Sequence, residues 1–444
     1  MAGTLAGCDS RDDLTILVDT LEDAHPDLFF HESRVSFDRA PALARSAMLR
    51  NPSSTGTFRA IAPLVSGIGD GHTYVSPYTS DYVRFRDHGG LLFPLELHVE
   101  DARASVTANY GPGAVPEASE VTSINGASIA RLLANFRRIE NGETPVQKDW
   151  NTTQDLRELL WIGGFRAPFV ITRRSGSVST RQTLSGCTID AIHRSDESEV
   201  GLQRFADYRL TLDATSRIAV LTVHDFSFDG VDKWHRFLLT MLHRLRQHRI
   251  KSLVVDVREN TGGNTERSDE LLETFAKHGF RDFSNVTTKI SRVTKTALGH
   301  DRYAEIYGED AWDAVDGTSI SSVATNEVEP LAPERRFSGN VVIVTGSGTF
   351  STAAIFAAAA QDSRNALIWG HPSGGFATLY GEVFSFELPH SKLSIGVSTK
   401  YLVRAAGGNA ARGVIPDRTF RETTQRLHDT ELDSIIASIA RYSK

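Results

Sequence analysis

The sequence predicts a multidomain α/β protein, and three observations support this fold class. From about Arg217 onwards, apolar runs typical of strands alternate with amphipathic stretches typical of helices, which is the pattern of a mainly parallel sheet covered by helices. Before that point, the chain has helical periodicity to about residue 85 and strand-like alternation from about Gly89 to Gly186. With 444 residues, 40% hydrophobic and 23% charged, the chain can form two or three domains with a substantial core.

The first predicted domain, residues 1–85, is helical. Apolar residues recur at helical spacing near its start, and Pro26 ends this first helix. A second helix is expected over about residues 39–50. A third follows the Asn51–Ser54 turn and leads toward His72.

The second predicted domain, residues 86–190, is rich in strands. Alternating apolar and polar residues, together with β-branched runs, indicate these strands. The stretch of about residues 135–164 interrupts the pattern and is interpreted as an insertion. Strands are expected at 95–99, 104–107, 169–172 and 180–184.

The third predicted domain, residues 191–425, is the α/β core. Its first elements alternate strand and helix, at 218–221, 231–248, 253–257 and 267–277. The segment of residues 279–336 is polar and is expected to be an irregular cover over the active site. Residues 426–444 are expected to form a closing amphipathic helix, because Leu432, Ile435, Ile436 and Ile439 share one helical face.

A serine at a strand-to-helix junction is the strongest candidate for catalysis. Val341–Val344 predicts a buried strand and Ala353–Gln361 predicts a helix, so Ser351 falls near the first turn of that helix. Free backbone N–H groups at a helix start can stabilise an oxyanion. Serine is also a favoured N-cap residue, so the position alone allows a purely structural role.

A second candidate segment is Asp256–Gly263, where a strand ends in a polar turn with two adjacent glycines. Paired glycines let the backbone approach a ligand closely. The amide of Gly262 or Gly263, together with that of Thr352, could therefore donate to a developing oxyanion. A tight turn that needs positive φ angles would also explain the glycines. The spacing is neither that of a dinucleotide-binding loop nor that of a phosphate loop.

Four segments, in this order, resemble the serine peptidase family that includes tail-specific, C-terminal processing proteases and the tricorn core protease. The resemblance spans most of the chain and is strongest from Arg217 to Asp417. It implies a layered catalytic core of the crotonase or ClpP type, with Ser351 as the nucleophile and a peptide or unfolded protein C-terminus as the substrate. The four segments are Asp70–Thr73, Asp256–Gly263, Ser351 with the helix up to Asp362, and Gly413–Asp417.

The general base differs between branches of this family. In the processing proteases it is a lysine that ends a Gly-x-Pro-Thr-x-Gly-Lys motif. The corresponding stretch here, Gly370–Phe376, ends in phenylalanine, which cannot accept a proton. The chain therefore resembles the histidine-dependent, tricorn-like branch, in which His72 holds the position of the base. Its ordinary pKa of about 6.5 suits proton transfer at neutral pH, although an ordered structural histidine is the alternative.

A histidine base needs a third group that fixes its tautomer and stabilises the imidazolium. The tricorn-like branch has a glutamate shortly before its Gly-Val-x-Pro-Asp motif, but this chain has Asn409–Arg412 there. Glu382, on an expected strand, is the first choice, followed by Asp70 and Asp417. Each of these carboxylates could instead be an exposed charge without a catalytic role.

Within residues 86–190, Val121–Gly126 resembles the Ile-Asn-Gly turn of PDZ domains. In the family described above, such domains hold the C-terminus of a substrate by strand addition. The resemblance implies a PDZ-like α+β module. A carboxylate-binding loop of the Gly-Leu-Gly-Phe type is not evident in the sequence, so peptide binding by this module stays open.

Composition excludes several other function classes. A net charge of −7 argues against nucleic acid as the main ligand, and no apolar run is long enough to span a bilayer. Cys8 and Cys187 cannot form a disulfide framework. The 15 histidines follow neither a His-Glu-x-x-His nor a cysteine-pair pattern, so neither a metal nor another cofactor is expected.

The localisation stays open because Leu5–Cys8 matches the bacterial lipoprotein processing pattern. A working signal needs a basic start and an apolar stretch of roughly 7–15 residues, which the few residues before the motif do not provide. If the chain starts as written, a cytoplasmic protein is expected. A leader upstream of Cys8 would make it extracytoplasmic or a lipoprotein.

The sequence therefore predicts a serine hydrolase that cleaves peptide or C-terminal tail amides, with Ser351 as nucleophile and His72 as base. One alternative keeps the fold but acts as a hydrolase or acyltransferase on a non-peptide ester, lactam or thioester. Another is a catalytically silent relative that binds a peptide or apolar ligand, since the family lysine and glutamate are both missing. The oligomeric state is not predicted.

Overall fold

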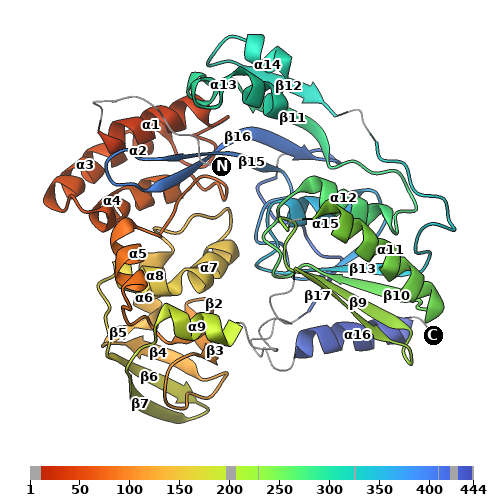
Figure 1. Ribbon diagram of the computed structural model, residues 1–444, viewed down its shortest axis with the longest axis horizontal. Coiled ribbons are helices and arrows are strands. Elements are labelled where there is room, and N and C mark those ends of the chain that lie inside the picture. The colour runs from red at the N-terminus through yellow and green to blue at the C-terminus, as the bar shows by residue number, and fades with distance from the viewer. Residues whose placement is uncertain are drawn as a thin grey trace. The chain divides into compact units, whose positions relative to one another are not determined.

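The computed structural model describes residues 12–196, 207–228, 230–324, 327–408, 410–420 and 429–442, and Figure 1 labels its helices and strands. The chain forms two compact units, each assembled from three segments. Unit 1 comprises residues 1–198, 287–322 and 380–401, and unit 2 comprises residues 199–286, 323–379 and 402–444.

Two of the sequence features lie outside the described residues, namely the Leu5–Cys8 motif and Asn409. Among the helices that the structure does describe, none combines the length and the apolar character needed to cross a bilayer.

Unit 1 begins with helices whose ends follow from the sequence. Asp12 caps the first helix by accepting a hydrogen bond from the Thr15 amide, and the helix ends before His25, whose backbone is extended just ahead of Pro26. The three predicted helices are confirmed as α1 (Asp13–Ala24), α3 (Ala40–Arg50) and α4 (Ser54–Gly67), and α2 (Arg34–Phe37) and α5 (Ser80–Asp87) are additional.

The strand-rich part of unit 1 is a sheet in the order β2-β3-β4-β6-β7, with β5 beside β4. Asn125 and Gly126 have φ angles of 46° and 82°, as the tight turn between β4 and β5 requires. The predicted strands are confirmed. They are β2 (Leu95–Glu100), β3 (Arg103–Asn109), β4 (Glu120–Ile124), β5 (Ala127–Ser128), β6 (Phe169–Ser175) and β7 (Val178–Leu184).

Helices fill the core of this module. Leu156 and Leu159, from the stretch interpreted as an insertion, pack with Leu97 and Ile171 of the sheet. That stretch therefore contributes to the core of the module. The helices are α6 (Ile129–Phe136), α7 (Pro145–Gln154), α8 (Leu156–Ile162) and α9 (Ile189–Asp196).

Two later chain segments complete unit 1 with a sheet in the order β1-β16-β11-β12, in which β15 also pairs with β16. Tyr74 of β1 lies opposite Gly396 of β16, where a Cβ would come within 2.4 Å of the tyrosine ring. The strands are β1 (Tyr74–Val75), β11 (Phe283–Lys289), β12 (Ser319–Val323), β15 (Leu379–Glu387) and β16 (Ser394–Arg404).

The expectation that residues 279–336 are irregular is wrong. Besides β11 and β12, the segment contains the helices α13 (Arg292–Tyr307) and α14 (Glu309–Asp313). Gly299 interrupts α13 with a φ of 71°, which breaks the helix geometry in its middle.

Unit 2 is built on a sheet in the order β17-β14-β13-β10-β9-β8. All neighbouring pairs are parallel except β8 with β9, so the predicted mainly parallel sheet is confirmed. The strands are β8 (Tyr208–Asp213), β9 (Ile218–Val223), β10 (Ser252–Asp256), β13 (Asn340–Thr345), β14 (Leu367–Gly370) and β17 (Arg418–Thr419).

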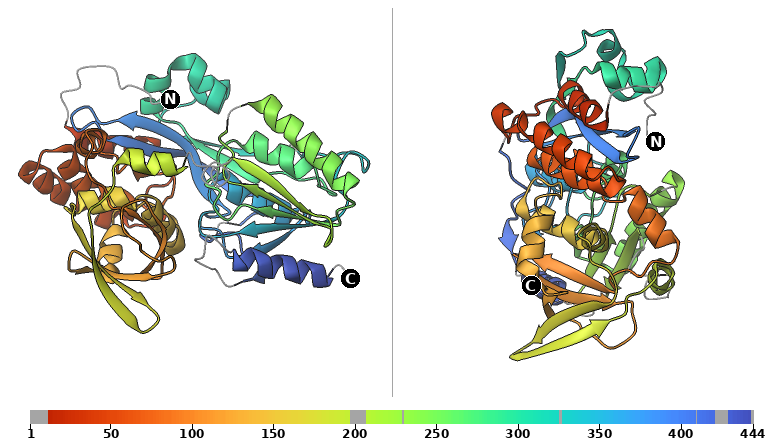
Figure 2. Two further views of the ribbon diagram at one scale, coloured as in Figure 1. Left: turned by 60° about the horizontal axis from the view of Figure 1, so that its bottom comes forward. Right: turned by 90° about the vertical axis from the view of Figure 1, so that its left-hand side faces the viewer.

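Helices cover both faces of this sheet, which explains why its central strands are unbroken apolar runs. Leu253 and Val255 of β10 pack with α11 (Val231–Gln247), α12 (Thr265–Glu273) and α15 (Thr352–Asp362), whereas Val254 packs with α16 (Thr430–Tyr442) on the other face. In Figure 2, α16 lies next to the C-terminus, across the sheet from the green helices.

Arg258 fastens the end of β10 to the start of α16. Its guanidinium lies 2.7 Å from an oxygen of Asp256 and 3.2 Å from an oxygen of Glu431, and it also pairs with Asp429. Burial would raise the pKa of Asp256, but the charge and hydrogen bonds of Arg258 hold it below its ordinary value. The buried carboxylates Asp256 and Glu431 therefore share Arg258 as a cation, and His371 Nε2 lies 3.4 Å from the other oxygen of Glu431.

Replacing Arg258 with methionine is expected to destabilise unit 2 by about 3–5 kcal/mol, because Asp256 and Glu431 would stay buried without their cation. Urea denaturation measures this change. Arg209→Met, which removes an exposed cation from β8, is the matched control and should change stability by less than about 0.5 kcal/mol. Equal stability of the two variants would show that the Arg258 network does not anchor α16.

Candidate active site

Ser351 stands on a strained turn between β13 and α15. Its φ and ψ angles are 52° and −127°, a region that residues other than glycine rarely adopt and that costs of the order of 1–3 kcal/mol. A sharp strand-to-helix turn of this kind is a known way to present a serine hydroxyl at the end of a sheet. Ser351 is partly exposed, so its hydroxyl is accessible to a ligand.

The side chain of Ser351 does not act as a helix cap. Although Ser351 occupies the N-cap position of α15, its side chain makes no capping hydrogen bond. The purely structural role that the sequence allowed is therefore not the one that the hydroxyl performs. Within the described residues, the amide of Thr352, the first residue of α15, donates no hydrogen bond and is available to an anion.

The paired-glycine turn lies directly against Ser351. A Cβ on Gly262 would come within 2.6 Å of the Ser351 Cβ and 3.0 Å of the Thr352 nitrogen, and Gly262 has a φ of 110°. The Thr352 hydroxyl donates to the Gly263 carbonyl at 2.6 Å. Since β10 and β13 are adjacent and parallel, the turns that follow them meet at one edge of the sheet. All four predicted residues are thus together.

Asn260 organises this turn, a role that the sequence analysis did not predict. It is fully buried, its Oδ1 accepts from the Gly262 amide at 2.9 Å, and its Nδ2 donates to the Val223 carbonyl at 3.1 Å. Its own carbonyl accepts from the Phe350 amide at 3.0 Å. Because Asn260 uses the Gly262 amide, Gly263 is the candidate that remains; across the described ranges its N–H has no hydrogen-bond partner.

The Gly413–Asp417 motif braces the sheet of unit 2. Oδ2 of Asp417 accepts from the Ile368 amide at 2.7 Å, and the Val414 amide donates to Ser373 Oγ at 2.7 Å. Asp417 therefore holds the start of β14. The carboxylate of Asp417 thus serves the backbone of unit 2, and its expected role in orienting the base stays a prediction.

In unit 1, Asp70 is the centre of a buried hydrogen-bond network. Its Oδ1 accepts from the His72 amide at 2.9 Å. Its Oδ2 accepts from Thr73 Oγ1 and Ser398 Oγ, both at 2.6 Å, and lies 3.2 Å from His25 Nε2. All five residues are buried. Asp70 therefore fixes the turn that carries His72 against β16.

The environment of His72 keeps its imidazole neutral. Burial lowers the pKa of His72 below its ordinary value, and the Asp70 carboxylate, 4.0 Å away, partly opposes this effect. Burial would raise the pKa of Asp70, but the hydrogen bond from His25 and the charges of His25 and His72 hold it below its ordinary value. An ionised carboxylate beside a neutral imidazole is the arrangement that a general base needs.

Glu143 is a second carboxylate at this position, and the sequence analysis missed it. One nitrogen of the His72 ring and one carboxylate oxygen each of Asp70 and Glu143 lie within 4.8 Å of one another. Asn141 fastens the loop of Glu143 to the histidine turn by donating from Nδ2 to the Gly71 carbonyl at 2.6 Å. Glu143 lies in the stretch interpreted as an insertion, about seventy residues from His72, so no sequence spacing indicated it.

In the part of the chain that the structure describes, these three groups are also the set of converging side chains that could hold a metal ion. Both oxygens of Asp70, however, already accept hydrogen bonds from protein groups. The donor set is therefore better suited to holding a proton on His72 than to ligating a cation.

Glu382, the first choice for the third group, has a different partner. Its Oε2 lies 3.2 Å from Lys400 Nζ, which also donates to the Ile306 carbonyl at 3.0 Å. The side chain is partly exposed, at 39% of its surface. The carboxylate of Glu382 therefore neutralises Lys400, and Asp70 is the predicted acid that lies at His72; a role of Glu382 in orienting the base stays a prediction.

Comparison with known proteins places these observations in a family context. Residues 217–420, which carry Ser351 and both glycines, match the family model described as peptidase family S41. No curated protein sequence matches the chain.

Solved structures share the fold over nearly the whole chain. Mature CPAF aligns with a TM-score of 0.69 at 16% sequence identity, covering 96% of this chain and 95% of CPAF. Mature CPAF complexed with lactacystin aligns with a TM-score of 0.69 at 15% identity, covering 97% of each chain. At these identities the likeness concerns the fold, and the family match of residues 217–420 makes this protein a serine-type peptidase.

Proposed function

We propose that this serine-type peptidase hydrolyses amides in peptides or unfolded C-terminal tails through an acyl-enzyme formed on Ser351. The observation that carries the proposal is the strained backbone of Ser351. Its side chain makes no capping hydrogen bond and lies at the start of α15 beside Gly262. Backbone strain persists where the surrounding structure enforces it, and it is characteristic of catalytic positions. A serine kept only for helix capping would need no such strain and would use its hydroxyl on the helix.

His72 is the proposed general base. It removes the proton from Ser351 Oγ as that oxygen bonds to the carbonyl carbon of the substrate, and it then gives the proton to the leaving amine as the C–N bond breaks. Water, deprotonated by the same imidazole, attacks the acyl-enzyme and releases the carboxylic acid. The lowered pKa of His72 supports this role, because it favours the neutral imidazole, whose unprotonated ring nitrogen can accept the serine proton.

The amides of Thr352 and Gly263 are the proposed oxyanion donors. Their lack of hydrogen-bond partners in the described chain supports this role, as does the bond from Thr352 Oγ1 to the Gly263 carbonyl, which ties the two residues together. Asp70 and Glu143 are proposed to stabilise the imidazolium that forms on His72. His72 thus has carboxylates beside it, although the chain lacks the glutamate that the family has before Gly413.

The finer fold assignments support the choice of substrate. We propose that the α/β core is of the crotonase or ClpP type and that residues 86–190 form a PDZ-like module. In such a module, an extended peptide would add to a sheet edge, so a substrate C-terminus held there could guide a preceding bond to Ser351.

Fluorophosphonate labelling of the purified protein tests the nucleophile and the base separately. We expect rapid labelling of Ser351, as located by peptide mapping, with no labelling of Ser351→Ala and at least about 100-fold slower labelling of His72→Ala. Ser434→Ala, at an exposed position of α16 in the same unit, is the control serine and should be labelled at Ser351 as before. Unchanged labelling of His72→Ala would require another base, and an unlabelled but folded protein would favour a silent ligand-binding relative.

Gly262→Ala is expected to lower peptide turnover by at least about tenfold, because its Cβ would overlap with Ser351 and the Thr352 amide, and loss of one oxyanion donor alone typically costs 10²–10³ in turnover. Steady-state kinetics on a peptide library measures the loss. Gly407→Ala is the matched control, since Gly407 also has a positive φ but no atom near its Cβ position. Equal activity of the two variants would exclude Gly262 from the site.

The labelling rate is expected to rise with pH through an apparent pKa below the ordinary histidine value of about 6.5, since burial lowers the pKa of His72 and the neutral form is reactive. Glu143→Gln should move this transition further toward acid and slow the plateau rate, because a charge that stabilises the imidazolium is lost. Glu117→Gln, at an exposed position, should leave both unchanged. A transition that does not move in Glu143→Gln would remove Glu143 from the mechanism.

A further inference from the structure

The helix α11 of unit 2 and the turn that follows it carry a concentrated positive charge. Between Val231 and Lys251 the chain has six lysine and arginine residues and a single acidic one, Asp232, although the whole protein has a net charge of −7. The six cations are exposed, because the apolar face of α11 packs on the sheet. They are Lys233, Arg236, Arg244, Arg246, Arg249 and Lys251.

The cations at the C-terminal end of this segment have no acidic partners. Across the described ranges, no carboxylate lies within ion-pair distance of Arg244, Arg246, Arg249 or Lys251, and the guanidinium of Arg246 donates to the Glu334 carbonyl at 2.7 Å. The helix dipole favours cations in the last turn of α11. It does not account for Arg249 and Lys251, which follow that turn.

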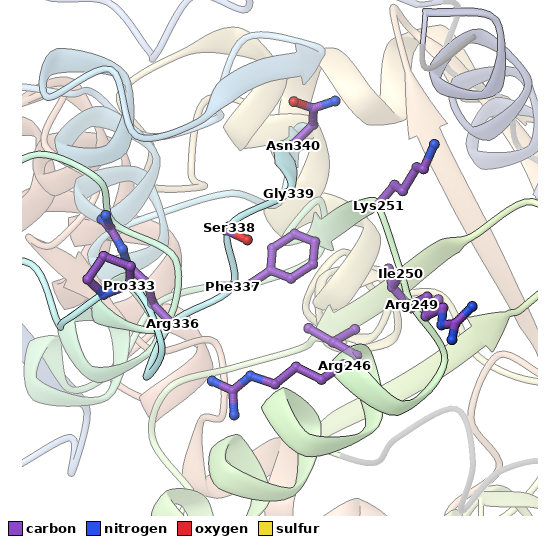
Figure 3. Close-up of a pocket in the computed structure, with 11 residues that line it drawn as sticks. Arg246, Arg249, Ile250, Lys251, Pro333, Arg336, Phe337, Ser338, Gly339 and Asn340 are labelled. Atoms are coloured by element: carbon purple, nitrogen blue, oxygen red, sulfur yellow. The ribbon is translucent and has the colours of Figure 1, made fainter.

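A pocket of about 450 Å³ lies beside this segment. Two chain segments line it, residues 245–251 with Arg246, Arg249 and Lys251, and residues 333–340 with Arg336 and Phe337; no carboxylate lines it. In Figure 3, Arg246 and Arg336 lie on one side of the Phe337 ring and Arg249 and Lys251 on the other. The volume is within the range of small-molecule sites.

Backbone features hold these two segments together. A Cβ on Gly339 would lie 2.3 Å from the Lys251 carbonyl and 2.4 Å from the Phe337 ring, so only glycine allows this close approach. Arg249 ends α11 with a φ of 51°, where glycine is the usual residue. The Nε atom of Arg336 is buried without a hydrogen-bond partner among the described residues. Nη1 of Arg336 donates to the Ala276 carbonyl, so this guanidinium is held in place beside the pocket.

We propose that this pocket binds a ligand with two or more phosphate groups. Guanidinium groups match phosphate oxygens in geometry as well as charge, and three arginines and a lysine surround the pocket without competing carboxylates. The Phe337 ring offers an apolar surface for the remainder of the ligand. Free phosphate compounds and phospholipid headgroups share this chemistry.

The pocket lies at the opposite edge of the sheet from Ser351. Lys251 directly precedes β10 and Asn340 begins β13, whereas the catalytic turns follow the other ends of these strands. Strands of this length span roughly 15–20 Å. The phosphate ligand is therefore distinct from the acyl group that Ser351 attacks, and its binding does not depend on the proposed mechanism.

Isothermal titration calorimetry of the full chain with pyrophosphate and with ATP, at constant ionic strength, tests the proposal. We expect saturable binding to one site per chain that Arg246→Gln and Arg249→Gln each weaken roughly tenfold or more. Arg236→Gln, which removes an exposed cation of the same helix outside the pocket, should bind as the unaltered chain does. Unchanged melting temperatures would establish that the variants are folded.

Sedimentation with phosphatidylglycerol vesicles, compared with phosphatidylcholine vesicles, distinguishes the source of the phosphate. Vesicle binding that pyrophosphate displaces and that Arg246→Gln abolishes would identify a lipid headgroup as the occupant. Two outcomes would overturn the proposal. One is that pyrophosphate, ATP and vesicles all fail to bind saturably. The other is an equal loss of binding in Arg236→Gln, which would indicate diffuse attraction to a basic surface.

Discussion

The parallel pairing of β10 with β13 is the constraint on which the rest of unit 2 depends. Both strands are buried on both faces, so their register is fixed by packing as well as by hydrogen bonds. Parallel strands end at the same edge, and this alone brings the turn of Gly262 to the turn of Ser351, about ninety residues later in the chain. Asn260 then locks the two turns by hydrogen bonds to both.

In unit 1, electrostatic interactions position the candidate residues. Asp70 is buried, yet it accepts enough hydrogen bonds to stay ionised, and that charge is what keeps the histidine turn in place. Burial and the carboxylate act on the imidazole in opposite directions. The lowered pKa favours the neutral imidazole, and a neutral imidazole can accept a proton.

The sequence predicted the elements with strong periodicity and the residues that belong to compact motifs. The parallel sheet, the first helices and the positions of Ser351, Gly262, Gly263 and Thr352 follow from local patterns. The partners of single carboxylates could not be predicted, because they depend on contacts between distant segments. Glu382 pairs with Lys400 and Asp417 with the backbone of Ile368, whereas Glu143 reaches His72 from a stretch without a family pattern. The helices around Gly299 were missed because the segment is polar and a glycine inside it is read as a break, as its φ of 71° within α13 bears out.

The segmented composition of the units has a consequence for synthesis of the protein. Unit 1 is not complete until residue 401 has been made, because Ser398 of β16 contributes to the Asp70 network and β16 pairs with β1. Unit 2 needs residues beyond that point as well, including Val414, which bonds to Ser373. Neither unit can therefore finish folding early while the chain is still growing. A chain that is still being made therefore lacks the complete Asp70 network and the Val414–Ser373 bond until these late residues have been added.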